Sequence, residues 1–169
     1  MEKYRTFSPR FFAQLIDGII FITIYYFYEL ILMVPEMPVS IIIAGLIISD
    51  FCYFFYSIYL HSVYGQTLGK MALKIKVLDI SENPIKLHQA FLRDAPNILS
   101  TIPFLAFDIY QISTAGLIDE SLRDNQLDYT ALTIVSVWLI AEIIVTLSNK
   151  KRRAIHDFIA GTVVVRTNH

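Results

Sequence analysis

A long apolar run near the N-terminus limits what this chain can fold into. The run extends from Phe11 to Val34, and its only charged residues are Asp17 and Glu29. A helix of this length measures roughly 36 Å, which is enough to cross a bilayer core of about 30 Å with some tilt. Inserting an aspartate inside such a helix costs about 2.5–3.5 kcal/mol, so Asp17 needs either a partner or a function. The run therefore predicts an integral membrane protein with buried ionisable groups.

Three further apolar runs follow the first. We place the four helices at residues 10–34, 39–60, 96–118 and 129–147. Ser8 as N-cap and Pro9 at the first helical position support the start of the first helix. The content of hydrophobic residues is 55%, above the roughly 45–50% of soluble domains. We expect an all-α membrane protein that forms a single domain over residues 1–169.

The distribution of charge predicts how these runs cross the membrane. If all four cross, every one of the 14 Lys and Arg residues except Arg123 lies on the same side as the termini. The opposite side then holds the acidic residues Glu36, Asp119, Glu120, Asp124 and Asp128. The positive-inside rule makes the basic side cytoplasmic, so we expect a multi-pass protein of the cell membrane with both termini in the cytoplasm. A three-span arrangement, with the third run lying on the membrane surface, would send the basic C-terminal segment outside.

The two predicted cytoplasmic segments, residues 61–95 and 148–169, contain strand patterns. Apolar and basic residues alternate over Ala72–Leu78, which is the period of a half-buried strand. Thr162–Thr167 is rich in β-branched residues. Because a lone strand is unstable in water, we expect these two distant segments to pair.

Short amphipathic helices are predicted in the same segments. Ile155, Phe158 and Ile159 recur at helical spacing, and Gly161 fits the position that ends a helix. Leu87–Leu92 predicts an interfacial helix that leads into the third span, which we expect to be kinked because it contains prolines.

Acidic residues inside the predicted spans are candidate functional groups. By helical rise, Asp17 and Glu142 lie roughly 7–10 Å from the cytoplasmic ends of their spans, whereas Asp50 and Asp108 lie near the midplane. Arg10 is two turns from Asp17 on the same helical face. The pair is interpreted as a structural ion pair, as an arginine that reaches out to lipid headgroups beside an aspartate paired elsewhere, or as part of an ion path.

The segment Gly65-Gln66-Thr67-Leu68-Gly69-Lys70 invites comparison with a phosphate-binding loop. Its glycine spacing is one residue short, and Met71 stands where a Ser or Thr would bind magnesium. Two interpretations remain, namely a tight turn between a span and a strand, or a backbone nest for a phosphate or a lipid headgroup.

Several blocks of the sequence together carry a family resemblance. They are Arg10 with Asp17, the Gly65–Lys70 segment with Thr67 and Gly69, the following Leu73–Val77 strand, Arg93 with Asp94, and Arg153–Thr162 with His156, Asp157 and Gly161. These blocks resemble the RDD family, a bacterial membrane family named for an arginine and two aspartates. The resemblance implies a membrane location and, as the usual expectation for the family, transport. The segment between Arg93 and Lys150 departs from the family pattern, because the family typically has one further span there and this segment is long enough for two.

These observations favour transport of a cation, a proton or a small solute through intramembrane carboxylates. The alternative is a non-catalytic scaffold or accessory subunit of a larger membrane complex. No catalytic constellation and no metal-ligand spacing is visible, so we expect no enzyme activity, no metal and no cofactor. The expected partners are the lipid bilayer and either further copies of the chain or other membrane proteins, with no nucleic acid.

Overall fold

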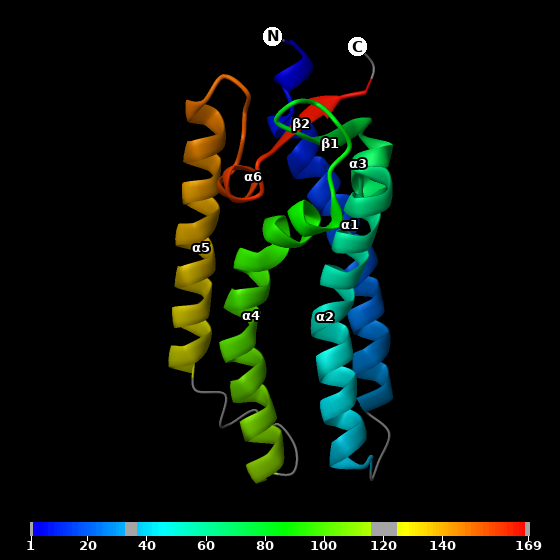
Figure 1. Cartoon of the computed structure of the whole chain (residues 1–169). Coiled ribbons are helices and arrows are strands. Elements are labelled where there is room, and N and C mark those ends of the chain that lie inside the picture. The colour runs from blue at the N-terminus through cyan, green and yellow to red at the C-terminus, as the bar shows by residue number, and fades with distance from the viewer. Residues whose placement is uncertain (1, 33–36, 116–124, 168–169) are drawn as a thin grey trace.

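The computed structural model describes residues 2–32, 37–115 and 125–167, so Glu36, Asp119, Glu120, Arg123 and Asp124 lie outside the described residues, as does the side chain of Asp128. Long helices α1 (Phe7–Leu32), α2 (Val39–Tyr64), α4 (Leu87–Ala115) and α5 (Asn125–Ser148) lie side by side (Figure 1). The smaller elements are η1 (Glu2–Tyr4), α3 (Leu68–Ala72), β1 (Ile75–Asp79), α6 (Ile155–Ile159) and β2 (Thr162–Arg166). They gather at one end of the bundle, where both termini lie.

Two of the helical segments are long and apolar enough to cross a membrane. They are Glu2–Tyr28, which includes most of α1, and Val39–Tyr64, which is α2. Large apolar side chains such as Ile22 and Phe55 are exposed on these helices, as expected where lipid covers them. In α5 the apolar part found in the described residues is the shorter segment Thr133–Ser148. The expected membrane character is thus supported, while the count of four spans stays a prediction.

Helix α4 joins two elements that the sequence analysis had separated. The expected interfacial helix at Leu87–Leu92 and the expected third span at 96–118, as far as Ala115, form one continuous helix that contains Pro96 and Pro103, and residues 116–118 lie outside the described residues. A proline inside a helix lacks one backbone hydrogen bond and crowds the preceding turn, so a bend is expected. Figure 1 shows α4 bending in its N-terminal part.

The predicted pairing of the two distant strands is confirmed. β1 and β2 are antiparallel, with a register that runs from Ile75 opposite Arg166 to Asp79 opposite Thr162. The buried residues of the sheet, among them Ile75, Val77 and Val164, pack with Ala13 of α1 and Ala90 of α4. The sheet therefore covers the end of the bundle where α1 and α4 begin.

The connection between α2 and β1 is not the simple tight turn that the sequence suggested, because it contains the short helix α3. Gly65 ends α2 with a φ of 71°, and the side chain of Thr67 caps α3 by accepting from the backbone of Lys70. A Cβ atom at Gly69 would lie 2.1 Å from the carbonyl oxygen of Ala13, so only glycine lets α3 approach α1 this closely. The first residues of the predicted strand Ala72–Leu78 belong to this helix and its final turn, and the strand begins at Ile75.

Candidate functional site

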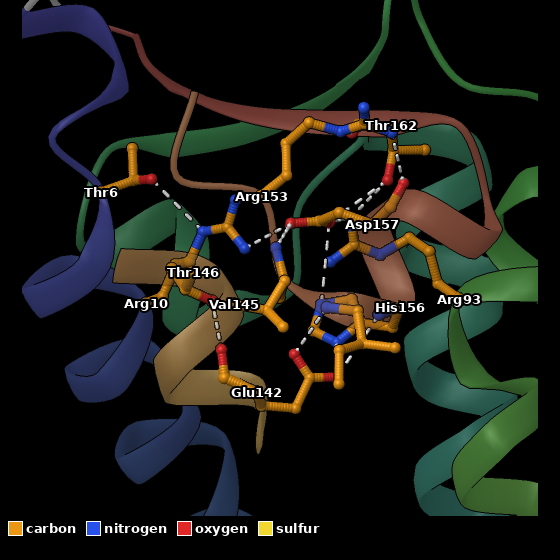
Figure 2. Close-up of polar contacts among 12 residues, drawn as sticks. Thr6, Arg10, Arg93, Glu142, Val145, Thr146, Arg153, His156, Asp157 and Thr162 are labelled. Atoms are coloured by element: carbon orange, nitrogen blue, oxygen red, sulfur yellow. Dashed lines mark hydrogen bonds and ion pairs between the residues drawn. The ribbon is translucent and has the colours of Figure 1, made fainter. Parts of the chain in front are cut away.

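A buried carboxylate on α6 joins four separate elements of the chain. Asp157 accepts hydrogen bonds from Nη1 of Arg10 at 2.5 Å and from Nη1 of Arg93 at 2.6 Å. It also accepts from the backbone of Ala154 at 3.0 Å and from the hydroxyl of Thr162 at 3.2 Å. Figure 2 shows its carboxylate between the two guanidinium groups. This cluster ties α1 and α4 to the segment that carries α6 and β2.

The charge of Asp157 is balanced by its surroundings. Complete burial favours the neutral acid, but the guanidinium groups of Arg10 and Arg93 outweigh burial and hold the pKa of Asp157 well below its ordinary value. Arg153 fixes α6 from outside, because it donates to the carbonyl of Thr162 at 2.8 Å and to that of Asp157 at 3.0 Å. Asp157 is therefore ionised, and its charge helps to hold α1 and α4 against α6.

Asp17 does not pair with Arg10, and the expected ion pair between them is wrong. Its carboxylate accepts from the hydroxyl of Tyr56 at 2.8 Å, from the hydroxyl of Thr67 at 2.6 Å and from the backbone amide of Gly69 at 2.8 Å. Asp17 is paired elsewhere, as the second interpretation expected, whereas Arg10 is buried and bound to Asp157 and does not reach out to lipid headgroups. The Gly65–Lys70 segment binds this carboxylate with one backbone amide, that of Gly69, and with the hydroxyl of Thr67, so it does not form the backbone nest of the second interpretation.

Lys70 and His61 form a buried contact that sequence reasoning missed. Nζ of Lys70 lies 2.7 Å from Nε2 of His61, whose Nδ1 lies 2.8 Å from the carbonyl oxygen of Ser57. We assign the ring proton to Nδ1, because a carbonyl can only accept, so Nε2 accepts from the lysine. Burial lowers the pKa of Lys70 to about 7, and the neighbouring Arg93 contributes to the same shift. The pKa of Lys70 therefore lies well below that of an exposed lysine.

Glu142 of α5 holds the start of α6. It accepts hydrogen bonds from the backbone amide of Ile155 at 2.9 Å and from that of His156 at 3.3 Å. Its Oε1 atom also lies 2.9 Å from Nδ1 of His156 (Figure 2). A carboxylate at this position satisfies amides that a helix leaves unpaired at its N-terminus. Glu142 thus connects α5 to the Asp157 cluster.

These groups surround a cavity of about 290 Å³, which we call the polar cavity. Its titratable and amide-bearing lining residues are Arg10, Gln14, Asp17, Tyr53, His61, Lys70, Arg93, Asp94, Asn97, Glu142 and His156. Within the described residues, Nη2 of Arg10 and Oδ2 of Asp94 are buried without a hydrogen-bond partner. Buried polar atoms are rarely left unpaired, but both atoms are too enclosed to face the cavity, so the cavity is characterised by its ionisable lining residues.

The structure brings together most of the residues that the sequence singled out. Arg10, Asp17, Lys70, Arg93, Asp94, Glu142 and His156 line the polar cavity, while Arg153 and Asp157 support it. Gly65, Gly69 and Gly161 shape the backbone: Gly161 has a φ of 64° and follows Ala160, the residue that caps the end of α6, as expected. Asp50 and Asp108 are not among the lining residues. They lie on α2 and α4, close enough to interact electrostatically.

Sequence reasoning missed the uncharged partners of the site. Tyr56, Ser57 and His61 lie within two turns at the end of α2, and Thr162 begins β2. A usable signal was present, because hydroxyl and imidazole groups clustered at one end of an apolar helix need partners in a membrane protein.

Comparison with known proteins identifies the family. The sequence profile of the RDD family matches residues 4–161, which is nearly the whole chain. The match includes the region between Arg93 and Lys150, which the sequence blocks had left outside the resemblance. Comparisons with curated proteins and with solved structures give no match. The chain belongs to the RDD family.

Proposed function

We propose that this protein transports a small polar or charged solute across the cell membrane and binds it in the polar cavity. The observation that carries the proposal is the polar cavity of about 290 Å³, which is lined by ionisable side chains from α1, α2, α4 and α5. Ionisable groups inside a membrane bundle commonly mark a substrate or ion pathway. No bond-making chemistry is needed for this role, so the proposal is a non-enzymatic one.

The proposal includes four spans with both termini in the cytoplasm. Support comes from the placement of α4 and α5 beside α1 and α2 in Figure 1 and from the basic residues on the side of the sheet. The test uses single cysteines at Asn125 and Asn168 in a chain with Cys52→Ser. A membrane-impermeant thiol reagent should label position 125 in intact cells and leave position 168 unlabelled. Labelling at both positions would mean an odd number of spans.

Within this proposal the two carboxylates outside the cavity continue the path. Asp50 and Asp108 lie deeper along α2 and α4, on helices that pack together, and interact with each other. Acids near the midplane can exchange a proton or hold a cation on its way across. A bundle of this size is small for a conducting unit, so we expect several copies to assemble.

The direct test is flux through purified protein in liposomes. Wild-type protein should release protons, cations or small solutes along their gradients, and Asp94→Asn should lower the rate at least tenfold. The control is Glu82→Gln, which removes an acid at the surface contact with Lys3 and Tyr4, away from the cavity. Equal rates for wild type and Asp94→Asn would exclude the cavity from the path.

The alternative function, a scaffold or accessory subunit, is favoured by a different observation. Large apolar side chains near the sheet end, Ile80, Leu87, Phe91, Phe158 and Ile159, are each about half exposed. Exposed apolar surface of this kind is typical of interaction sites. A wild-type protein without flux that purifies stably with another membrane protein would support this function and reject transport.

A further inference from the structure

The short helix α6 lies beside the long helices and not beyond their ends. Glu142 of α5 accepts from the backbone amide of Ile155, the first residue of α6, at 2.9 Å. By helical rise, Glu142 lies about 9 Å before Ser148, the last residue of α5. The chain therefore turns back after α5, and Figure 1 shows α6 alongside this helix. Asp157 also holds α6 at the level of Arg10 of α1.

The long helices expose apolar side chains at this level. Phe11 and Phe12, which follow Arg10 on α1, are each more than half exposed, and so is Ile144, which lies close to Glu142 on α5. This part of α1 belongs to a segment that is long and apolar enough to cross a membrane. Large apolar patches on such a segment are stable in contact with lipid and not in contact with water. The outer surface of α6 therefore lies at a level that the bilayer reaches.

The exposed surface of α6 and of the elements beside it is itself apolar. It consists of five side chains, which we call the apolar face: Ile80, Leu87, Phe91, Phe158 and Ile159. Nε2 of Gln89 on α4 donates to the carbonyl of Ala160 at 3.4 Å, and a Cβ atom at Gly161 would lie 3.8 Å from Ile80. These contacts place the start of α4 and the residue after β1 against the end of α6, so the five side chains lie on adjoining elements.

The start of α4 is amphipathic in the opposite sense to a helix in water. Leu87 and Phe91 are exposed, whereas Ala90, Arg93 and Asp94 are buried. A helix on the surface of a soluble protein buries its apolar stripe and exposes its charges. Here the charges face the protein interior and the large apolar side chains face outwards. This arrangement is stable where the surroundings are the boundary between lipid headgroups and acyl chains.

Basic residues border the apolar face. They are Lys86, Lys150, Lys151, Arg152 and Arg153, all exposed or half-buried. Within the described segments 86–94 and 150–161 the acids are Asp94 and Asp157, and both are buried. The guanidinium of Arg153 lies 4.1 Å from the ring centroid of Phe158, so positive charge and apolar surface are adjacent. Basic residues beside an apolar face are typical of surfaces that bind anionic lipids.

We propose that the apolar face inserts into the bilayer at the level of the headgroups and upper acyl chains, and that the basic residues beside it bind anionic phospholipids. The occupant is a lipid surface and not a partner protein, because the apolar face continues the exposed apolar surfaces of α1 and α5 at the same level. The bordering positive charge selects anionic headgroups. This inference goes beyond transport, since it holds whether or not the protein carries a solute.

Nitroxide labels test the depth of the apolar face. Single cysteines replace Phe158 or Phe91 in the full-length chain with Cys52→Ser, and the labelled protein is reconstituted into vesicles of equal parts phosphatidylcholine and phosphatidylglycerol. Both labels should be relaxed more by oxygen, which concentrates in lipid, than by a water-soluble nickel chelate. The lipid control is Ile22→Cys at an exposed position of α1, and the water control is Thr167→Cys at the far end of the sheet.

Two outcomes would overturn the proposal. A label at position 158 that behaves like the label at position 167 would place the apolar face in water. Low access to both reagents at positions 158 and 91, in contrast to position 22, would mean that protein covers the face and would support the accessory role instead. Neither measurement uses flux, so a failure here leaves the test of transport unaffected.

Spin-labelled lipids test the choice of headgroup on the wild-type protein, without any substitution. Labelled phosphatidylglycerol should associate with the protein at least about twofold more than labelled phosphatidylcholine, because each basic residue at an anionic surface strengthens binding severalfold. The combined change Lys86→Gln and Lys150→Gln should reduce this ratio, whereas Lys74→Gln, an exposed lysine beside Thr167, should not. Lys151 is kept because it lies near Glu82. Equal association of the two lipids with wild-type protein would reject the anionic headgroup.

Discussion

The structure predicts a large loss of stability when Asp157 is replaced by Asn. The substitution keeps the shape of the side chain and removes the charge that balances Arg10 and Arg93, both of which are at least nine-tenths buried. Breaking a buried ion pair by removing one partner typically costs about 3–5 kcal/mol, because the remaining charge is left uncompensated. For a chain of this size, 1 kcal/mol changes the melting temperature by about 2–4 °C. We therefore expect a fall of about 6–20 °C.

Thermal unfolding of the detergent-solubilised protein, followed by intrinsic fluorescence, measures this effect. The control Glu82→Gln removes an acid that accepts from Lys3 and Tyr4 at the surface and should leave the melting temperature nearly unchanged. Combining Asp157→Asn with Arg93→Met should cost less than the sum of the two single changes, because they remove members of one pair. A melting temperature within error of wild type for Asp157→Asn, or strict additivity in the double variant, would refute the reasoning.

Three further predictions concern Gly69, Lys70 and Asp50. Gly69→Ala should lower the melting temperature, because its Cβ atom would lie 2.1 Å from the carbonyl oxygen of Ala13, whereas Gly18→Ala has open space and should not. Burial lowers the pKa of Lys70 to about 7. Unfolding then takes up a proton between this value and the usual lysine pKa near 10.4, so the melting temperature should rise with pH over that range and Lys70→Met should flatten the rise. Asp50→Asn should fold normally yet lose pH- or cation-dependent flux in liposomes, and unaltered flux would remove Asp50 from the path.

The sheet was predictable because its signal is local. Apolar residues alternate through Ile75 and Val77, and the β-branched stretch from Thr162 offers a partner of matching length. The start of β1 was placed too early, because the backbone of Leu73 donates to the carbonyl of Gly69 and closes α3. The alternation of apolar and basic side chains does not show where the hydrogen bonds of the preceding helix end. The first residue of β1 could therefore not be predicted from it.

The pairing of charges was not predictable in the same way. Helical spacing correctly places Arg10 and Asp17 near the same end of α1, but spacing along one helix reports only local neighbours. The actual partner of Arg10 is Asp157, which follows 147 residues later, and Asp17 is bound by the turn before α3. These partners depend on where α6 and α3 dock, which is a tertiary property. The family blocks made it possible to expect that these residues lie in one cluster. They did not show which residues pair with each other inside it.

The hydrogen bonds change which acid is the better candidate for contacting a ligand. The sequence drew attention to Asp17 first. Asp17, the acid most conspicuous in an apolar helix, is fully bound by Tyr56, Thr67 and Gly69. A carboxylate with three donors has little capacity left for a ligand, so its main effect is to fasten α3 against α1. Asp94 was singled out only as part of a family block, yet it lines the polar cavity and its Oδ2 atom has no partner in the described part of the chain. We therefore expect substitutions at Asp17 to change unfolding and substitutions at Asp94 to change the proposed flux.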